Sequence, residues 1–199
     1  MDSILHTARL TLRPLDAGDA APSARIMSPA IARWTGSWTG SETAEAVQQR
    51  IDRYLDSERS GVSFNRAMVV TATGALIGWI GVRRLDAEPE RGSLGYWLGE
   101  AWFGLGYTKE AARAIVDAAW DALGVEVLEG AAQVANLASH KVLLGVGMRH
   151  MGQRQEFATA RGAADLCDWY ELRRPTWPDP GADSAGTATR SRRAPSPRP

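Results

Sequence analysis

The segment from Gly95 to Gly124, GYWLGEAWFGLGYTKEAARAIVDAAWDALG, constrains the fold more than any other part of the chain. The apolar run at 94–98 leads into a glycine-rich loop, and a helix is predicted to begin near Thr108. The apolar residues of this helix recur at the spacing of one buried face: Ala112, Ile115, Val116, Ala119, Trp120 and Leu123. Gly124 is a helix stop signal. The pattern therefore predicts a strand, a glycine loop and an amphipathic helix in succession.

The junction between this loop and the helix is suited to binding an anion. The first N–H groups of a helix have no intrahelical partner and lie at the positive end of its dipole. Glycines before the helix can adopt positive φ, which lets successive N–H groups turn toward phosphate oxygens. The spacing is neither G-x-G-x-x-G, because Lys109 lies three residues after Gly106, nor a P-loop, because no G-K-[ST] follows. The alternative is a purely structural turn.

Composition favours one domain and excludes several function classes. At 199 residues the chain is long enough for one substantial core. Its 23 basic and 23 acidic residues cancel, so charge alone predicts neither nucleic-acid nor membrane binding. The single cysteine, Cys167, excludes an internal disulfide and is expected to pack in the core. The sequence has no long apolar run and no export leader, so we expect a cytoplasmic protein with no membrane span. Its histidines lack the spacing of metal ligands, so we expect no metal.

The remaining patterns predict an α+β domain at 1–177. Strands are expected at 7–15, 64–72, 75–85 and 125–134, with two more around Gly162. Helices are expected at 16–27 and at 41–59 with Ser41 as N-cap. The segment 136–148, which the family resemblance given below implies to be a helix, has a core-like face of Ala138, Val142 and Leu143. This order suits a mixed, mostly antiparallel, twisted sheet flanked by helices. Residues 178–199 are rich in Pro, Ser, Ala and Arg and are predicted to form a disordered tail.

The central segment resembles the coenzyme A loop of the GCN5-related N-acetyltransferases (GNAT), and in particular that of the RimJ/RimL-like subgroup. That subgroup typically reads GYWL, then W-G-x-G-Y-A, then T/S-E-A; this chain has GYWL at 95–98, WFGLGYT at 102–108 and KEAA at 109–112. TARLTLRPL at 7–15 and NLASHKVLLGVGM at 136–148 are similar to two further family patterns, and the resemblance extends to about residue 177. In the superfamily pattern Q/R-x-x-G-x-G/A, Phe103 replaces the first residue and Thr108 the last.

The resemblance implies a GNAT-like fold and an enzyme that transfers an acetyl group from acetyl-CoA to a primary amine. The acceptor would be a protein N-terminus or a small amine such as an antibiotic, attacking directly in a ternary complex. The strand that holds Trp97 and Leu98 would bind the pantetheine arm, and a backbone N–H near Leu98 would polarise the thioester. The diphosphate would be held by Phe103, Gly104, Leu105, Gly106, Tyr107 and Thr108. Asn136 would bind the arm, or else only end the preceding strand.

Catalytic candidates also follow from the resemblance. Many relatives protonate the leaving thiolate with a tyrosine at the position of Leu143, which has no proton to donate. Ser139 matches the serine of the RimL-like branch and is the expected acid, with helix capping as its alternative role. Relatives often carry a glutamate base where this chain has Ser93. Glu156, on the strand after the last helix, and Glu100 and Asp86, near the loop, are the remaining candidates, and a water chain is the alternative.

Two tryptophans, Trp34 and Trp38, lie in a segment interrupted by proline and glycine. They either close one end of the core or form the wall of an acceptor pocket. A rival function is a catalytically degenerate CoA-binding or scaffold module, favoured by the departures at Ser93, Phe103 and Leu143. A third is ribosome association through the basic tail. The sequence leaves open the acceptor, the acyl group and the oligomeric state, including a homodimer.

Overall fold

The computed structural model describes residues 3–175. The strands are β1 (Leu5–His6), β2 (Leu10–Arg13), β3 (Ser63–Val70), β4 (Ala75–Arg84), β5 (Arg91–Leu98), β6 (Val127–Gln133), β7 (Arg149–Ala158) and β8 (Ala163–Arg173). The helices are α1 (Ala20–Ile26), α2 (Pro29–Ala32), α3 (Ala44–Arg59), α4 (Tyr107–Leu123) and α5 (Leu137–Gly145), with 3-10 turns η1 (Ala17–Asp19) and η2 (Glu100–Trp102). The predicted tail at 178–199 lies outside the described residues.

The eight described strands form one sheet in the order β1-β2-β3-β4-β5-β6-β8-β7. Neighbouring strands are antiparallel except β5 and β6, which are parallel and are connected through α4. The α+β prediction of a mixed, mostly antiparallel sheet is therefore confirmed.

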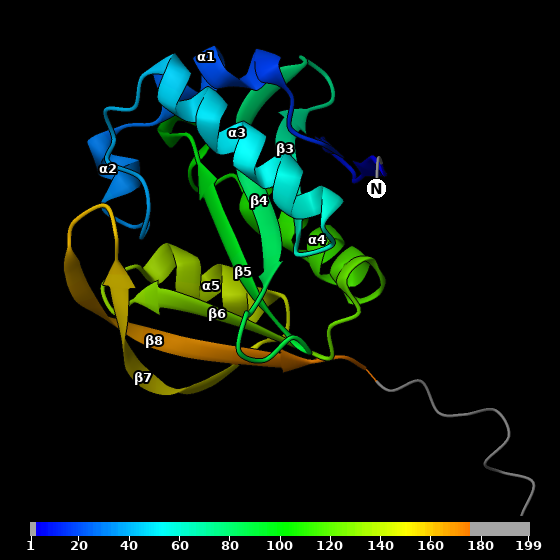
Figure 1. Cartoon of the computed structure of the whole chain (residues 1–199), viewed down its shortest axis with the longest axis vertical. Helices are drawn as coiled ribbons and strands as arrows, with labels where there is room; N and C mark the ends of the chain where they lie inside the picture. The colour runs from blue at the N-terminus through cyan, green and yellow to red at the C-terminus, as the bar shows by residue number, and fades with distance from the viewer. Residues whose placement is uncertain (1–2, 176–199) are drawn as a thin grey trace, which may run out of the picture.

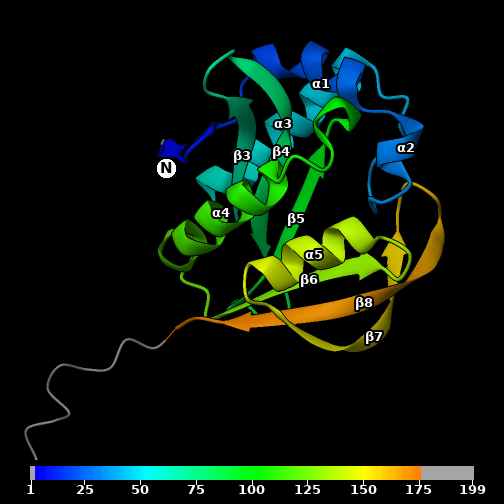
Figure 2. The same cartoon turned by 180° about the vertical axis from the view of Figure 1, so that it is seen from behind.

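Helices cover both faces of the sheet (Figures 1 and 2). On one face, α1 and α3 enclose a cluster that includes Val47, Ile51 and three tryptophans. On the other face, α4 packs its predicted apolar stripe, including Ile115 and Val116, against Leu94 and other sheet residues. Consecutive residues of β5 point to opposite faces, so Leu94 and Leu98 pack on the α4 side while Trp97 belongs to the other cluster. None of the described helices is both long and apolar enough to cross a bilayer.

The start of α3 differs from the sequence prediction. The N-cap is Thr43, whose hydroxyl accepts a hydrogen bond from the Ala46 N–H, and not Ser41. The Glu42 carboxylate accepts hydrogen bonds from the N–H groups of Thr39 and Gly40, which holds this stretch in a turn. The helix therefore begins two residues later than Ser41 as N-cap would place it.

Candidate active site

The sheet opens between β5 and β6. These strands pair at three positions, Arg91–Val127, Gly92–Leu128 and Ser93–Glu129, and then diverge (Figure 1). Beyond Ser93, the edge of β5 that faces β6 has no strand partner among the described residues. Backbone N–H and C=O groups on such an edge are available to an extended ligand.

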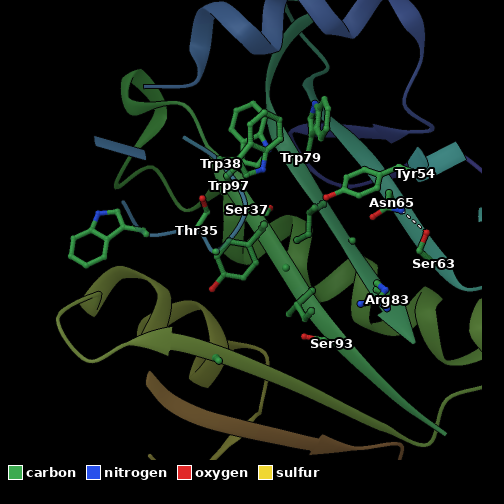
Figure 3. Close-up of a pocket in the computed structure, with 18 of the residues that line it drawn as sticks. Thr35, Ser37, Trp38, Tyr54, Ser63, Asn65, Trp79, Arg83, Ser93 and Trp97 are labelled. Atoms are coloured by element: carbon green, nitrogen blue, oxygen red, sulfur yellow. Dashed lines mark hydrogen bonds between the residues drawn. The ribbon is translucent and has the colours of Figure 1, made fainter. Parts of the chain in front are cut away.

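A cleft of about 500 Å³ occupies this opening. Its walls come from β3, β4, β5, β6, α3, α5 and the loop after α2. In Figure 3, Trp38, Trp79 and Trp97 cluster at one end of the cleft and Arg83 and Ser93 lie toward the other. Gly95 lies between these ends, and a Cβ atom there would have no heavy atom within 4 Å. The centre of the strand thus leaves room for a ligand to approach the backbone closely.

The glycine loop before α4 has the geometry of an anion site. Gly104 and Gly106 adopt φ of 75° and 80°, and Gly106 is the N-cap of the 17-residue helix. Within the described chain, the backbone N–H groups of residues 104–109 have no hydrogen-bond acceptor. Thr108 is the second residue of α4 and not its cap. The free N–H groups at the helix start fit a diphosphate.

Arg9 adds a positive charge beside this loop. Its guanidinium donates to the Leu105 carbonyl at 2.9 Å and lies 4.3 Å from the centre of the Tyr107 ring. The Glu110 carboxylate holds it there, accepting from Arg9 Nε at 2.7 Å and from the Thr7 hydroxyl at 2.6 Å. Burial by itself would raise the pKa of Glu110, but these hydrogen bonds and the Arg9 charge hold that pKa below its usual value. Sequence reasoning missed Arg9, because its proximity to the loop depends on the tertiary fold.

Comparison with known proteins identifies the family. Residues 9–149 match the model of the acetyltransferase (GNAT) domain. The chain belongs to the GNAT acetyltransferase family. It is therefore an acetyl-CoA-dependent N-acetyltransferase, as the resemblance implied.

Individual relatives agree with this assignment. The acetyltransferase is 26% identical over 167 residues to the uncharacterized N-acetyltransferase p20 of Bacillus licheniformis, covering 83% of this chain and 92% of the relative. It superposes on the ribosomal-protein-S5-alanine acetyltransferase of Vibrio fischeri with a TM-score of 0.77 at 20% identity, over 88% and 99% of the two chains. RimJ of Mycobacterium smegmatis, solved in complex with CoA-disulfide, gives a TM-score of 0.76 at 19% identity, over 86% and 88%. These neighbours confirm the RimJ/RimL-like fold of the acetyltransferase.

The structure brings Asn136 and Ser139 to the cleft from the start of α5. Asn136 is 8% exposed and caps the helix, its side-chain oxygen accepting from the Ser139 N–H at 3.2 Å. Ser139 is thus the third residue of α5, and the capping role belongs to Asn136. The Ser139 hydroxyl makes no hydrogen bond within the described residues, so it is available to a ligand in the cleft.

Trp34 and Trp38 both line the cleft. Trp38 is 4% exposed and packs edge-on against Trp79 and Trp97, with ring centres 5.3 and 5.4 Å away. It therefore closes the core and forms part of the cleft wall at once. Their loop is tied to the β7–β8 hairpin, where the Ala160 N–H donates to the Gly36 carbonyl and the Arg161 guanidinium to the Thr35 carbonyl.

The two glutamates proposed from sequence lie outside this cleft. Glu100, in η2, accepts a 2.5 Å hydrogen bond from the Ser28 hydroxyl. Glu156 lines a separate cavity of about 190 Å³ and forms an ion pair with Arg154. Among the described residues that line the larger cleft, none is Asp or Glu. A base function for either glutamate stays a prediction.

Cys167 also lines the smaller cavity and is 5% exposed. Burial raises the pKa of its thiol, in agreement with the predicted packing role.

Tyr96 was missed by sequence reasoning, although it lies within the GYWL motif. From β5 its hydroxyl donates to the Ser139 carbonyl at 3.4 Å, which ties α5 to β5 across the opening. Burial raises the pKa of Tyr96 to about 12, so the hydroxyl stays protonated at physiological pH.

We expect Tyr96→Phe to change the alkaline stability of the acetyltransferase. The pKa of the Tyr96 hydroxyl is higher in the folded protein than in the unfolded chain, so the unfolded chain releases the hydroxyl proton at lower pH. The protonated hydroxyl therefore contributes to the free energy of unfolding below pH 10, and this contribution is lost as pH rises to about 12. The wild-type free energy of unfolding should therefore fall over this range by about 2 kcal/mol more than that of the variant. Urea unfolding at several pH values measures the difference. Parallel pH profiles for the two proteins would contradict it.

Proposed function

We propose that this acetyltransferase transfers the acetyl group of acetyl-CoA to a primary amine by direct attack in a ternary complex. The observation that carries the proposal is the single cleft through the opening of the sheet. It reaches Ser139 on the α5 side and Trp34 on the opposite side. Two substrates can thus meet at the free edge of β5 without a covalent enzyme intermediate.

Acetyl-CoA lies along the edge of β5 in this proposal. Trp97 and Leu98 hold the pantetheine arm with Asn136, and a backbone N–H near Leu98 polarises the thioester carbonyl. The loop from Phe103 to Thr108 holds the diphosphate. Support comes from the free N–H groups at 104–109 and from the guanidinium of Arg9 beside them.

The amine enters from the side of Trp34 and Trp38. Its neutral nitrogen attacks the thioester carbonyl carbon, so that a C–N bond forms and the C–S bond breaks. The thiolate takes a proton from the Ser139 hydroxyl while that hydroxyl regains a proton from water, and the proton lost by the amine passes to water, so Ser139 ends each turnover protonated. Transfer of the amine proton to water needs no carboxylate base, and the described residues that line the cleft include neither Asp nor Glu.

Two acceptor classes are compatible with this cleft. The name of the Vibrio fischeri neighbour specifies an alanine of a ribosomal protein as its acceptor. A protein N-terminus is accordingly one candidate acceptor for this acetyltransferase, and a small amine is the other.

A thiol-release assay tests the proposal. Purified protein is mixed with acetyl-CoA and a panel of amines and short peptides, and free coenzyme A and the mass of the acetylated product are measured. Turnover with at least one amine is expected. Coenzyme A binding without turnover across the panel would favour the degenerate binding module, for which Leu143 and Ser93 in place of the expected catalytic groups are the supporting observations.

A further inference from the structure

We infer that the cleft selects acceptor amines that also carry an anionic group, a carboxylate or a phosphate, and that Arg53 contacts this group. The inference rests on the proposed function, because it specifies the chemical class of the amine that is acetylated.

The first observation is the charge of the cleft. Its described lining includes two arginines, Arg53 and Arg83, and neither Asp nor Glu. Arg83 lies on β4 directly across from Ser93 of β5, the position at which relatives often carry a glutamate. Figure 3 shows these two residues at the same end of the cleft. Arg83 is ion-paired with Asp86, so this end of the cleft has neither an acidic lining residue among those described nor an uncompensated arginine.

The second observation is that Arg53 is unpaired. Within the described chain it makes no hydrogen bond or ion pair, although other arginines of α3 do. Arg50 donates to the Ser37 carbonyl at 2.7 Å, and Arg59 pairs with Asp56 at 2.7 Å. Arg83 pairs with Asp86 at 2.7 Å. Of the two arginines in the described cleft lining, Arg53 is therefore the one whose guanidinium can bind an anionic ligand without first breaking an ion pair.

Arg53 is exposed to solvent at the wall of the cleft, so its guanidinium is accessible to a ligand that enters there. A carboxylate or phosphate accepts hydrogen bonds from a guanidinium with well-matched geometry. An acceptor with several positive charges and no anionic group would be repelled.

Matched acceptors test this selectivity at constant amine chemistry. The dipeptide amides Ala-Asp and Ala-Asn differ in one charge, Ala-phosphoserine and Ala-Ser test phosphate, and Ala-Lys is the cationic member. Serine and O-phosphoserine repeat the comparison on a smaller scaffold. We expect kcat/KM to favour the anionic member of at least one matched pair by about tenfold, and the preference to decrease as salt is added.

Arg53→Gln should reduce this preference to within about twofold, whereas Arg59→Gln, on the same helix but outside the cleft, should retain it. Turnover of neutral or cationic amines with no anionic preference in any pair would overturn the inference and leave the proposed function intact. If no amine is turned over, the proposed function fails. Calorimetric titration of the same acceptors into the CoA-loaded protein then decides the inference, and anion binding equally strong in Arg53→Gln would overturn it.

Discussion

Gly106→Glu is expected to weaken the binding of coenzyme A by at least about 100-fold. Gly106 adopts φ of 80°, and an added Cβ would lie 3.6 Å from Arg9 Nη2. A glutamate would strain the turn and would place a carboxylate among the N–H groups expected to bind the diphosphate. Its charge would also pair with Arg9 and remove that cation from the site. Isothermal titration calorimetry with coenzyme A measures the effect.

Gly124→Glu is the matched control for this change. Gly124 has a φ of 64° with open space around it, and it ends the same helix. It lies about 25 Å from the loop at 1.5 Å of rise per residue. We expect both variants to lose some fold stability through backbone strain, but Gly124→Glu should retain its affinity for coenzyme A. Equal affinities for the two variants would refute the assignment of the loop.

Ser139→Ala is expected to lower kcat about 100-fold and to leave the affinity for coenzyme A unchanged. Ser139 lines the cleft and its hydroxyl has no hydrogen-bond partner in the described chain, whereas Asn136 caps the helix. Loss of the hydroxyl therefore removes a proton donor without removing a cap. Steady-state kinetics and calorimetry separate the two effects.

Ser60→Ala serves as the control, because its exposed hydroxyl bonds to the Asp56 carbonyl at 3.0 Å outside the cleft. It should match the wild type in kcat. A Ser139→Ala variant with wild-type turnover would remove Ser139 from the mechanism. A lower melting temperature with unchanged kcat would instead assign it a structural role.

The glycine turn and the helix after it could be predicted from sequence because both are local features. The glycines at 104 and 106 and the apolar stripe of α4 lie within one short segment, and their spacing specifies a positive-φ turn followed by a helix. Capping of α5 was expected as the alternative role of Ser139, but the cap is Asn136, whose side-chain oxygen accepts from the Ser139 N–H. The expected N-cap at Ser41 was wrong, because hydrogen bonds to the neighbouring Glu42 carboxylate hold the preceding turn.

The sequence alone therefore determined the α+β class, the strand–loop–helix unit and the family resemblance, since each depends on periodicity or on neighbours in the chain. Tertiary structure decided where β5 and β6 diverge. It also decided that Glu110 holds Arg9 beside the glycine loop. Finally, it placed Arg53 and Arg83 in one cleft whose described lining includes neither Asp nor Glu. Those features join residues that are far apart in the chain. Their juxtaposition depends on how the sheet pairs and packs, and no local pattern encodes it.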